Sequence, residues 1–333
     1  WLSNFSIYIP TLSACRTLTG PYDIAVAGME VRGIVTNTPA VDAFRGAGRP
    51  EANYLLERLM DHIADVMGMD RVGVRQVNLI KPEQIPYKMV EGGTVDSGDM
   101  PGLLSEAMEK ADWLGFEARR RVSAEQGKSR GIGLSMYLEQ CGGGGGASVD
   151  IEFHKDGTAT VYAAQQDNGQ AHRTTLTQIF SGRLGYDAEL INIVQGDSLR
   201  TPPGTTGGAR MSAVLGSTLM QAAGMIAEQA LPFAAEHLQA EIGDIQFAEG
   251  IFTAAGTNQS VTIEDLVRLI ATDDPAQHPL NRVHDYTTDG ATYPYGCHIV
   301  EIEVDQQTYR PEIVNYTVVD DFGEIINPLT LEG

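Results

Sequence analysis

A short loop at residues 41–50, VDAFRGAGRP, combines two permanent cations with small residues. Arg45 and Arg49 flank a Gly-Ala-Gly core, in a chain with only 23 basic residues against 44 acidic ones. Glycine and alanine let main-chain N–H groups approach a ligand closely, and the loop runs into an expected helix N-terminus. Together with arginine, these donors favour an anionic oxygen or sulfur group. The structural alternative is a helix-entry turn whose arginines pair with the abundant carboxylates.

Two glycine-containing loops follow later in the chain. Residues 141–146 read CGGGGG, which suits close contact with a bulky ligand but, taken alone, favours a slack connection. Residues 167–175 read DNGQAHRTT, where Gln170 offers an amide donor to a ligand. The more common structural alternative for this second loop is a helix cap by Asp167 or Asn168.

A fourth loop at residues 204–212, GTTGGARMS, resembles a phosphate-binding nest before a helix. It lacks the Gly-Lys-Ser/Thr of a P-loop, which disfavours an NTPase. The chemistry shared by the four loops is main-chain N–H groups plus Arg and Gln donors. This set indicates one large, polyanionic, hydrogen-bonding cofactor rather than a small substrate. No acid–base dyad, Ser/His/Asp pattern or reactive cysteine accompanies it.

Composition excludes several other classes of protein. The 333 residues suggest two domains or one large one. The net charge of −21 repels a phosphate backbone, so nucleic acid is not an expected partner. No apolar run approaches the ~18 residues of a membrane-spanning helix. Cys15, Cys141 and Cys297 are far apart and indicate reduced thiols of a cytoplasmic protein, the default location. The first residues show no clear signal peptide, and we expect a fragment at both ends.

Helical spacing predicts the elements that begin at these loops. A helix follows the opening loop, with Pro50 in its first turn, Gly68 at its exit and one apolar face consisting of Ala52, Leu55, Leu56, Leu59, Met60, Ile63, Val66 and Met67. Residues 81–101 are rich in Pro and Gly and are predicted to form a linker or surface loop. Asp99 is expected to cap a second helix that ends in the basic cluster at residues 119–121, on a solvated face.

The rest of the chain mixes strands with helices. A strand is predicted at 131–140, a hairpin at 148–154 and 158–164, a short strand at 190–197, and a second hairpin at 298–305 and 311–321. Helices are predicted at 172–184 and, rich in alanine, at 212–238. Hairpins interspersed with helices favour an α+β fold over a doubly wound sheet.

Five motifs carry a family resemblance. In chain order they are TNTPAVDAFRGAGRPEA, RGIGLSMYLE, NGQAHRTTLTQ, GTTGGARMS and HIVEIEVD…VVDDFGEIINPLTLEG. This order closely resembles the molybdopterin-binding large subunit of the xanthine dehydrogenase family, most of all its aerobic carbon monoxide dehydrogenase-type large chains. The resemblance implies two molybdopterin-cofactor-binding domains of mixed sheets and helices, truncated at both ends. Residues 1–92 would be the C-terminal part of the first domain and residues 93–333 the second.

The resemblance also implies site residues. Residues 43–47 resemble the loop that lies against the molybdenum centre, with Arg45 as an electrostatic stabiliser of catalysis. Gly169 and Gln170 resemble a segment that binds the pterin, and Arg210 would bind phosphate. The implied cofactor-binding residues are Ala43, Phe44, Arg45, Gly46, Ala47, Gly169, Gln170, Thr205, Thr206, Gly207, Gly208, Ala209, Arg210 and Ser212. No side chain would bind the metal, because the family holds molybdenum through the pterin dithiolene.

The implied activity is oxidative hydroxylation of an aldehyde or N-heterocycle, with water as the oxygen source. The cofactor would be molybdenum-molybdopterin in its cytosine dinucleotide form. Electrons would leave through iron–sulfur clusters and FAD on a small and a medium partner subunit.

Departures from the family pattern keep two alternatives open. The family's glutamate base and its Gly-Phe-Gly loop lie outside this chain. CO oxidation is one alternative, but the cysteine that carries copper in such enzymes is absent from Arg45-Gly46-Ala47-Gly48-Arg49. A non-catalytic cofactor-binding scaffold is the other. Ala171 replaces the second glycine of Gly-Gln-Gly, and Met211 replaces a Ser or Thr; both changes leave the main-chain donors in place.

Overall fold

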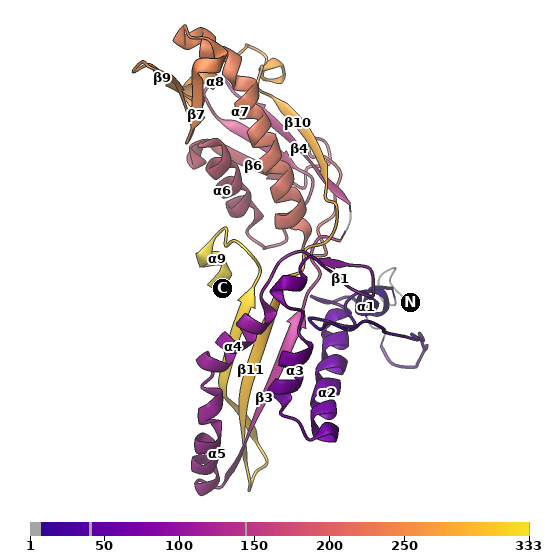
Figure 1. Ribbon diagram of the computed structural model, residues 1–333. Coiled ribbons are helices and arrows are strands. Elements are labelled where there is room, and N and C mark those ends of the chain that lie inside the picture. The colour runs from indigo at the N-terminus through magenta and orange to yellow at the C-terminus, as the bar shows by residue number, and fades with distance from the viewer. Residues whose placement is uncertain (1–7, 40–41, 144, 333) are drawn as a thin grey trace. The chain divides into compact units, whose positions relative to one another are not determined.

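The computed structural model describes residues 8–39, 42–143 and 145–332 (Figure 1). The chain forms two compact units, one of residues 1–141 and 290–323 and the other of residues 142–289 and 324–333. Both mix helices with sheets, which confirms the predicted α+β class. The domain division at residues 92 and 93 remains a prediction.

The first unit is built on the antiparallel sheet β12-β11-β3. Helix α4 lies along β11 and β12 (Figure 1). The elements of this unit are α1 (Tyr8–Cys15), α2 (Arg49–Met67), α3 (Arg71–Asn78), η1 (Pro82–Gln84), β1 (Tyr87–Lys88), β2 (Thr94–Val95), α4 (Met100–Lys110), η2 (Trp113–Gly115), α5 (Phe116–Glu125), β3 (Lys128–Leu138), β11 (Tyr295–Asp305) and β12 (Pro311–Asp321).

Helix α2 begins at the opening loop, as predicted. The Gly48 N–H donates to the Glu51 carboxylate at 2.9 Å, and Pro50 occupies the first turn. The helix ends at Gly68, whose φ of 63° suits glycine. Its buried face includes Ala52, Leu56, Met60 and Ala64. Hydrophobic spacing therefore placed the helix correctly, but the predicted apolar face is wrong for Leu55, Leu59, Val66 and Met67, which are exposed.

A buried ion pair joins α2, α3 and β3. The Arg75 Nε donates to Glu57 Oε2 at 2.9 Å, and the Arg75 side chain is fully buried. Glu57 also accepts hydrogen bonds from the Tyr22 hydroxyl at 2.5 Å and the Met136 N–H at 2.9 Å. The Arg75 Nη1 donates to Asp61 at 3.0 Å. Burial raises the pKa of Glu57, although the charge of Arg75 opposes this. Both charges are buried, so each is stabilised by the other rather than by water.

Two glutamates of β11 form a second ion network. The fully buried Glu301 accepts hydrogen bonds from Arg119 Nη2 and Arg130 Nε, each at 2.7 Å. Glu303 accepts from the Ser123 hydroxyl at 2.6 Å and from Lys128 Nζ at 2.7 Å. The prediction of a solvated face for the cluster at 119–121 is therefore wrong for Arg119.

The Glu301 network predicts acid sensitivity. Burial alone would raise the pKa of Glu301, but hydrogen bonds from Arg119 and Arg130 outweigh it and hold the pKa below its ordinary value of 4.5. This contribution to stability is therefore complete above pH 4.5 and is lost as the pH falls through the lower folded-state pKa. We expect the free energy of unfolding in urea to fall with acidification below pH 4.5, and to fall less steeply in Glu301→Gln. Identical pH dependence in the two proteins would contradict this assignment.

Two segments of this unit differ from the prediction. The helix expected from Asp99 through residue 121 is interrupted at Asp112, whose φ is 47°. Helix α4 stops before this residue, and Arg119 of the separate helix α5 reaches Glu301. The predicted linker at 81–101 contains the two-stranded ribbon β1-β2.

The second unit is built on the mixed sheet β10-β4-β5-β6. Its elements are β4 (Gly146–Phe153), β5 (Ala159–Ala163), α6 (His172–Leu184), η3 (Ala188–Leu190), β6 (Ile191–Gln195), the π-helix η4 (Met211–Gly216), α7 (Ser217–Leu238), η5 (Ile242–Asp244), β7 (Ile245–Ala248), β8 (Ile251–Ala254), β9 (Ser260–Thr262), α8 (Ile263–Leu269), η6 (Pro275–Gln277), β10 (Arg282–Thr287) and α9 (Pro328–Glu332).

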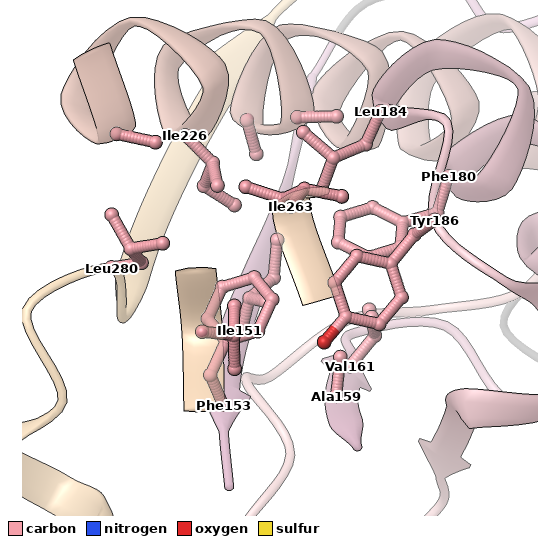
Figure 2. Close-up of a cluster of buried hydrophobic side chains, with 14 of the residues drawn as sticks. Ile151, Phe153, Ala159, Val161, Phe180, Leu184, Tyr186, Ile226, Ile263 and Leu280 are labelled. Carbon is pink, nitrogen blue, oxygen red and sulfur yellow. The ribbon is translucent and has the colours of Figure 1, made fainter. Parts of the chain in front are cut away.

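Helices α6 and α7 pack on this sheet around one apolar core. Figure 2 shows the rings of Phe153, Phe180 and Tyr186 gathered between strand and helix, beside Ile226 of α7 and Ile263 of α8. All five of these side chains are fully or almost fully buried. The core therefore anchors the starts of α6 and α7, where two of the predicted loops end.

Strand directions place three loops at one edge of the sheet. Strand β5 pairs parallel with β6, so the loops that follow them, at 164–171 and 196–210, leave from the same edge. Strand β4 is antiparallel to β5, so the glycine loop that precedes it lies there too. The carboxyl edge of parallel strands is a common place for ligands.

Helix α7 differs from the predicted 212–238 helix at its start. Residues 211–216 form the π-helix η4, and regular α-helix begins at Ser217. Val214, Leu215 and Gly216 of the π-helix are buried. Such segments are rare and occur often beside functional sites.

Candidate functional site

The Arg45 loop is held in one conformation by its glycines. The Ala47 N–H donates to the Phe44 carbonyl at 2.7 Å, and the Arg49 N–H donates to the Gly46 carbonyl at 2.9 Å. Gly46 and Gly48 have φ values of 76° and 91°. A Cβ on Gly48 would lie 2.6 Å from a main-chain nitrogen of α1, so only glycine fits. Val41, the first residue of this loop, lies outside the described residues.

The two arginines of this loop have different environments. The Arg49 Nη2 lies 2.6 Å from Glu139 Oε1, and its Nη1 donates to the Ala47 carbonyl at 3.0 Å. Arg45 is exposed and makes no hydrogen bond or ion pair with any residue that the structure describes. The structural alternative is therefore correct for Arg49, which clamps the loop, while Arg45 keeps its donors for a ligand.

Asp167 organises the loop between β5 and α6. Its Oδ1 accepts the N–H groups of Gly169 at 2.7 Å and Gln170 at 2.9 Å, and its Oδ2 accepts that of His172 at 3.1 Å. Burial favours a higher pKa for Asp167, but these N–H donors outweigh it and lower the pKa. The predicted cap is wrong in its position, because the N-cap residue of α6 is Ala171; Asp167 instead accepts the N–H of the first helical residue, His172, from four residues before the N-cap. Gln170 Oε1 accepts the Asn168 N–H at 2.5 Å, which leaves the amide NH₂ of Gln170 as a donor.

Replacing Asp167 tests this organisation. We expect Asp167→Asn to destabilise the chain by about 1–2 kcal/mol, because a neutral amide offers one acceptor in place of two beside a helix N-terminus. Urea denaturation measures the effect, with Asn168→Ala as the control, since the Asn168 side chain is exposed and makes no described hydrogen bond. Equal loss in both variants would refute the assigned role.

Ala171 stands where the family pattern has a glycine, and its backbone is strained. Its φ is 61°, in the left-handed region, where an L-residue is disfavoured by roughly 1–2 kcal/mol. The methyl group is therefore tolerated at the expense of backbone strain.

The loop at 204–210 offers a row of main-chain donors. Within the described residues, the N–H groups from Gly204 to Ala209 donate no hydrogen bond. Gly208 and Ala209 adopt consecutive left-handed conformations, with φ of 64° and 50°. Consecutive N–H groups in such turns form concave anion sites. The loop therefore has the donor set that an anion site requires, and its role as a phosphate site stays a prediction.

Direct contacts join the three loops of the second unit. The Thr206 hydroxyl donates to the Gln166 carbonyl at 2.7 Å, and the Gly142 N–H donates to the Gly208 carbonyl at 2.9 Å. Arg210 Nη2 lies 3.5 Å from the Gly142 carbonyl. The interpretation of the glycine run as slack is therefore wrong for Gly142; Gly144 lies outside the described residues.

Three functional candidates were not predicted. Glu139 pairs with Arg49 across 90 residues of sequence, which no local pattern reveals. Gln165 Oε1 and His172 Nδ1 are buried and have no hydrogen-bond partner in the described chain. Burial lowers the pKa of His172, although the charge of Asp167 opposes this, so the imidazole is neutral at neutral pH. Unmet polar atoms beside a row of unused N–H donors fit a hydrogen-bonding cofactor.

Comparison with known proteins identifies the family. Two molybdopterin cofactor-binding domain families match, one at residues 1–79 and the other at residues 106–333, which is more than half of the chain. The chain belongs to the molybdopterin cofactor-binding domain family. This confirms the resemblance drawn from the five motifs. Among the described residues, no group of three His, Cys, Asp or Glu side chains is placed to hold a metal ion.

Relatives of this molybdopterin cofactor-binding chain include redox enzymes. It is 31% identical to the carbon monoxide dehydrogenase large chain of Hydrogenophaga pseudoflava, over 95% of this chain and 42% of that protein. It is 30% identical to subunit gamma of the 6-hydroxypseudooxynicotine dehydrogenase complex of Paenarthrobacter nicotinovorans, over 94% and 41%. The solved structure of reconstituted CO dehydrogenase from Oligotropha carboxidovorans matches with a TM-score of 0.89 and 28% identity, over 96% and 42%.

The chain thus spans about two fifths of the length of these relatives. Within the described residues, no helix combines the length and apolarity that crossing a membrane requires.

Proposed function

We propose that this chain is the central part of a molybdenum hydroxylase large subunit, which oxidises an aldehyde or an N-heterocycle with water as the oxygen source. The observation that carries the proposal is the row of unused main-chain donors from Gly204 to Ala209, at the carboxyl edge of β5 and β6. Membership of the molybdopterin cofactor-binding family and the redox activity named for its relatives support it.

Each loop has a distinct role in this proposal. The donors of residues 205–209, with Arg210 and Ser212, bind the phosphates of the cofactor, and Gly169 and Gln170 bind its pterin through the free amide NH₂. When bound, the cofactor supplies the oxidation chemistry and accepts the substrate's electrons. Residues 43–47 line the reacting centre, where the Arg45 guanidinium stabilises negative charge that develops on the substrate.

The assembly is part of the same proposal. The cofactor is the cytosine dinucleotide form, with its metal held through the pterin dithiolene. A small iron–sulfur subunit and a medium FAD-binding subunit take the electrons onward, in the cytoplasm. The first cofactor-binding domain ends near residue 92, and the second begins at residue 93.

CO oxidation is the second candidate, because two relatives are named carbon monoxide dehydrogenase large chains. The residues after Arg45 weigh against it. They are Gly46 and Ala47, and neither supplies a thiol for a second metal.

Assay of the full-length complex tests the proposal. We expect stoichiometric molybdenum by mass spectrometry and dye-linked oxidation of an aldehyde or N-heterocycle. Oxidation of CO alone would favour the second candidate. Bound molybdenum without oxidation of any of the three substrate types would favour a cofactor-binding scaffold, and absence of molybdenum would refute all three assignments.

A further inference from the structure

Four buried side-chain atoms in the described chain lack a hydrogen-bond partner, and two of them bracket the loop between β5 and α6. These are Gln165 Oε1 and His172 Nδ1, on side chains that are 1% and 2% exposed. The other two belong to Arg282 and Thr288. A buried polar atom without a partner is destabilising, and each such atom requires an explanation.

Other groups of this loop satisfy part of its main chain. Asp167 accepts three N–H groups, and Gln170 Oε1 accepts a fourth. The Gln166 carbonyl accepts the Thr206 hydroxyl, and the Gln195 amide donates to the Gln165 carbonyl. Among the side chains of the loop, the groups that remain for a ligand are the Gln170 NH₂ and the two unmet atoms.

The chemistry of this set differs from that of the 204–210 loop. An amide oxygen only accepts hydrogen bonds, so the partner of Gln165 Oε1 must carry an N–H or O–H. A phosphate has no such donor at neutral pH, whereas the row of main-chain N–H groups at 204–209 suits phosphate well. A nitrogen heterocycle carries both donors and acceptors. Its amino and ring N–H groups can donate to Gln165 Oε1, its carbonyl group can accept from the Gln170 NH₂, and its ring can also hydrogen-bond to the imidazole nitrogen of His172.

We propose that Gln165 and His172 bind the nitrogen-heterocyclic end of the ligand whose anionic end lies on the 204–210 loop. The inference rests on the proposed function and extends its binding site by two residues. Both atoms are closed to solvent, so the proposal requires each side chain to rotate to meet the ligand. The two unmet hydrogen bonds favour that rotation. The heterocycle is either the pterin or the nucleobase of the cofactor.

Isosteric variants of the full-length complex test this inference. In Gln165→Met and His172→Leu, we expect the molybdenum cofactor to be released about tenfold faster, because a hydrogen bond of ordinary strength is worth about that factor. The melting temperature of the cofactor-free complex is expected to stay the same or rise, since an unmet polar atom has been removed. If Gln165 or His172 had only a structural role, its replacement would lower that melting temperature.

Two further variants are controls. Thr288→Val removes the same kind of unmet atom outside the loop, and it is expected to leave cofactor release unchanged. His172→Asn keeps a polar atom near the position of Nδ1, and it is expected to restore slow release. Release within about twofold of wild type in both isosteric variants would overturn the inference.

Titration of the cofactor-free complex separates the possible ligands. A pterin and cytidine 5′-diphosphate are added separately, and the variants are expected to weaken binding of one of them about tenfold. The weakened probe identifies the ring. Equal affinity of variants and wild type for both probes would overturn the inference. If the wild-type complex contains no molybdenum, the proposed function fails, and this titration still decides the roles of Gln165 and His172.

Discussion

Replacing Arg45 by alanine in the full-length complex is expected to lower kcat by about 10²–10³-fold and to leave KM nearly unchanged. Removal of one preorganised donor at a developing charge has an effect of this size, and an interaction made only in the transition state acts on kcat. Arg45 has no other described partner, so its donors are available to the reacting groups. Steady-state kinetics with the substrate of the complex measure the effect.

The contacts of Arg49 allow a change in kcat to be assigned to Arg45 itself. Arg49 and Glu139 hold the loop through contacts that do not involve Arg45, so the loop should keep its conformation in the variant. Arg45→Lys retains the charge but not the planar fork, and an intermediate rate is expected. Arg32→Ala is the matched control, an exposed arginine that pairs with the exposed Glu30. A kcat for Arg45→Ala within about twofold of wild type would exclude Arg45 from catalysis.

Replacing Arg75 by methionine is expected to destabilise the chain by about 3–5 kcal/mol, because it leaves the Glu57 charge buried without its cation. Denaturation in urea measures the loss. Arg120→Met in α5 is the matched control, where an exposed arginine pairs with the exposed Glu117 at 2.9 Å. That exposed pair should contribute less than about 1 kcal/mol.

A double variant refines the second prediction. Glu57→Leu combined with Arg75→Met removes both charges and should regain part of the lost stability. Recovery should be incomplete, since the Tyr22 hydroxyl and the Met136 N–H lose their acceptor. A single Arg75→Met variant as stable as Arg120→Met would show that the pair is not needed for folding.

Sequence alone predicted the elements whose signals are local. The spacing of Ala52, Leu56 and Met60 placed α2, and alternation placed the β4-β5 and β11-β12 hairpins. The break at Asp112 was missed because a left-handed aspartate carries no periodic signal.

The site was predictable in composition but not in arrangement. The residue types of the four loops suggested donors for an anionic cofactor, but only the pairing of β5 with β6 and with β4 brings three of the loops to one edge. The distinction between Arg45 and Arg49 depends on Glu139, which lies far away in sequence. Unmet atoms such as Gln165 Oε1 become visible only when every neighbouring hydrogen bond is known.

Because the π-helix at residues 211–216 follows the loop at 204–210, the orientation of that loop depends on the number of residues in the π-helix. Each residue of an α-helix advances the chain by about 100° around its axis. Deleting one residue from this segment would let regular α-helix continue upstream of Ser217, although the segment also contributes Val214 and Leu215 to the core. The donors at 204–210 would then turn by about that angle relative to the helix. Insertions and deletions here should therefore change cofactor binding, so an alignment of relatives that places a gap within 211–216 would mark lineages with an altered anion site.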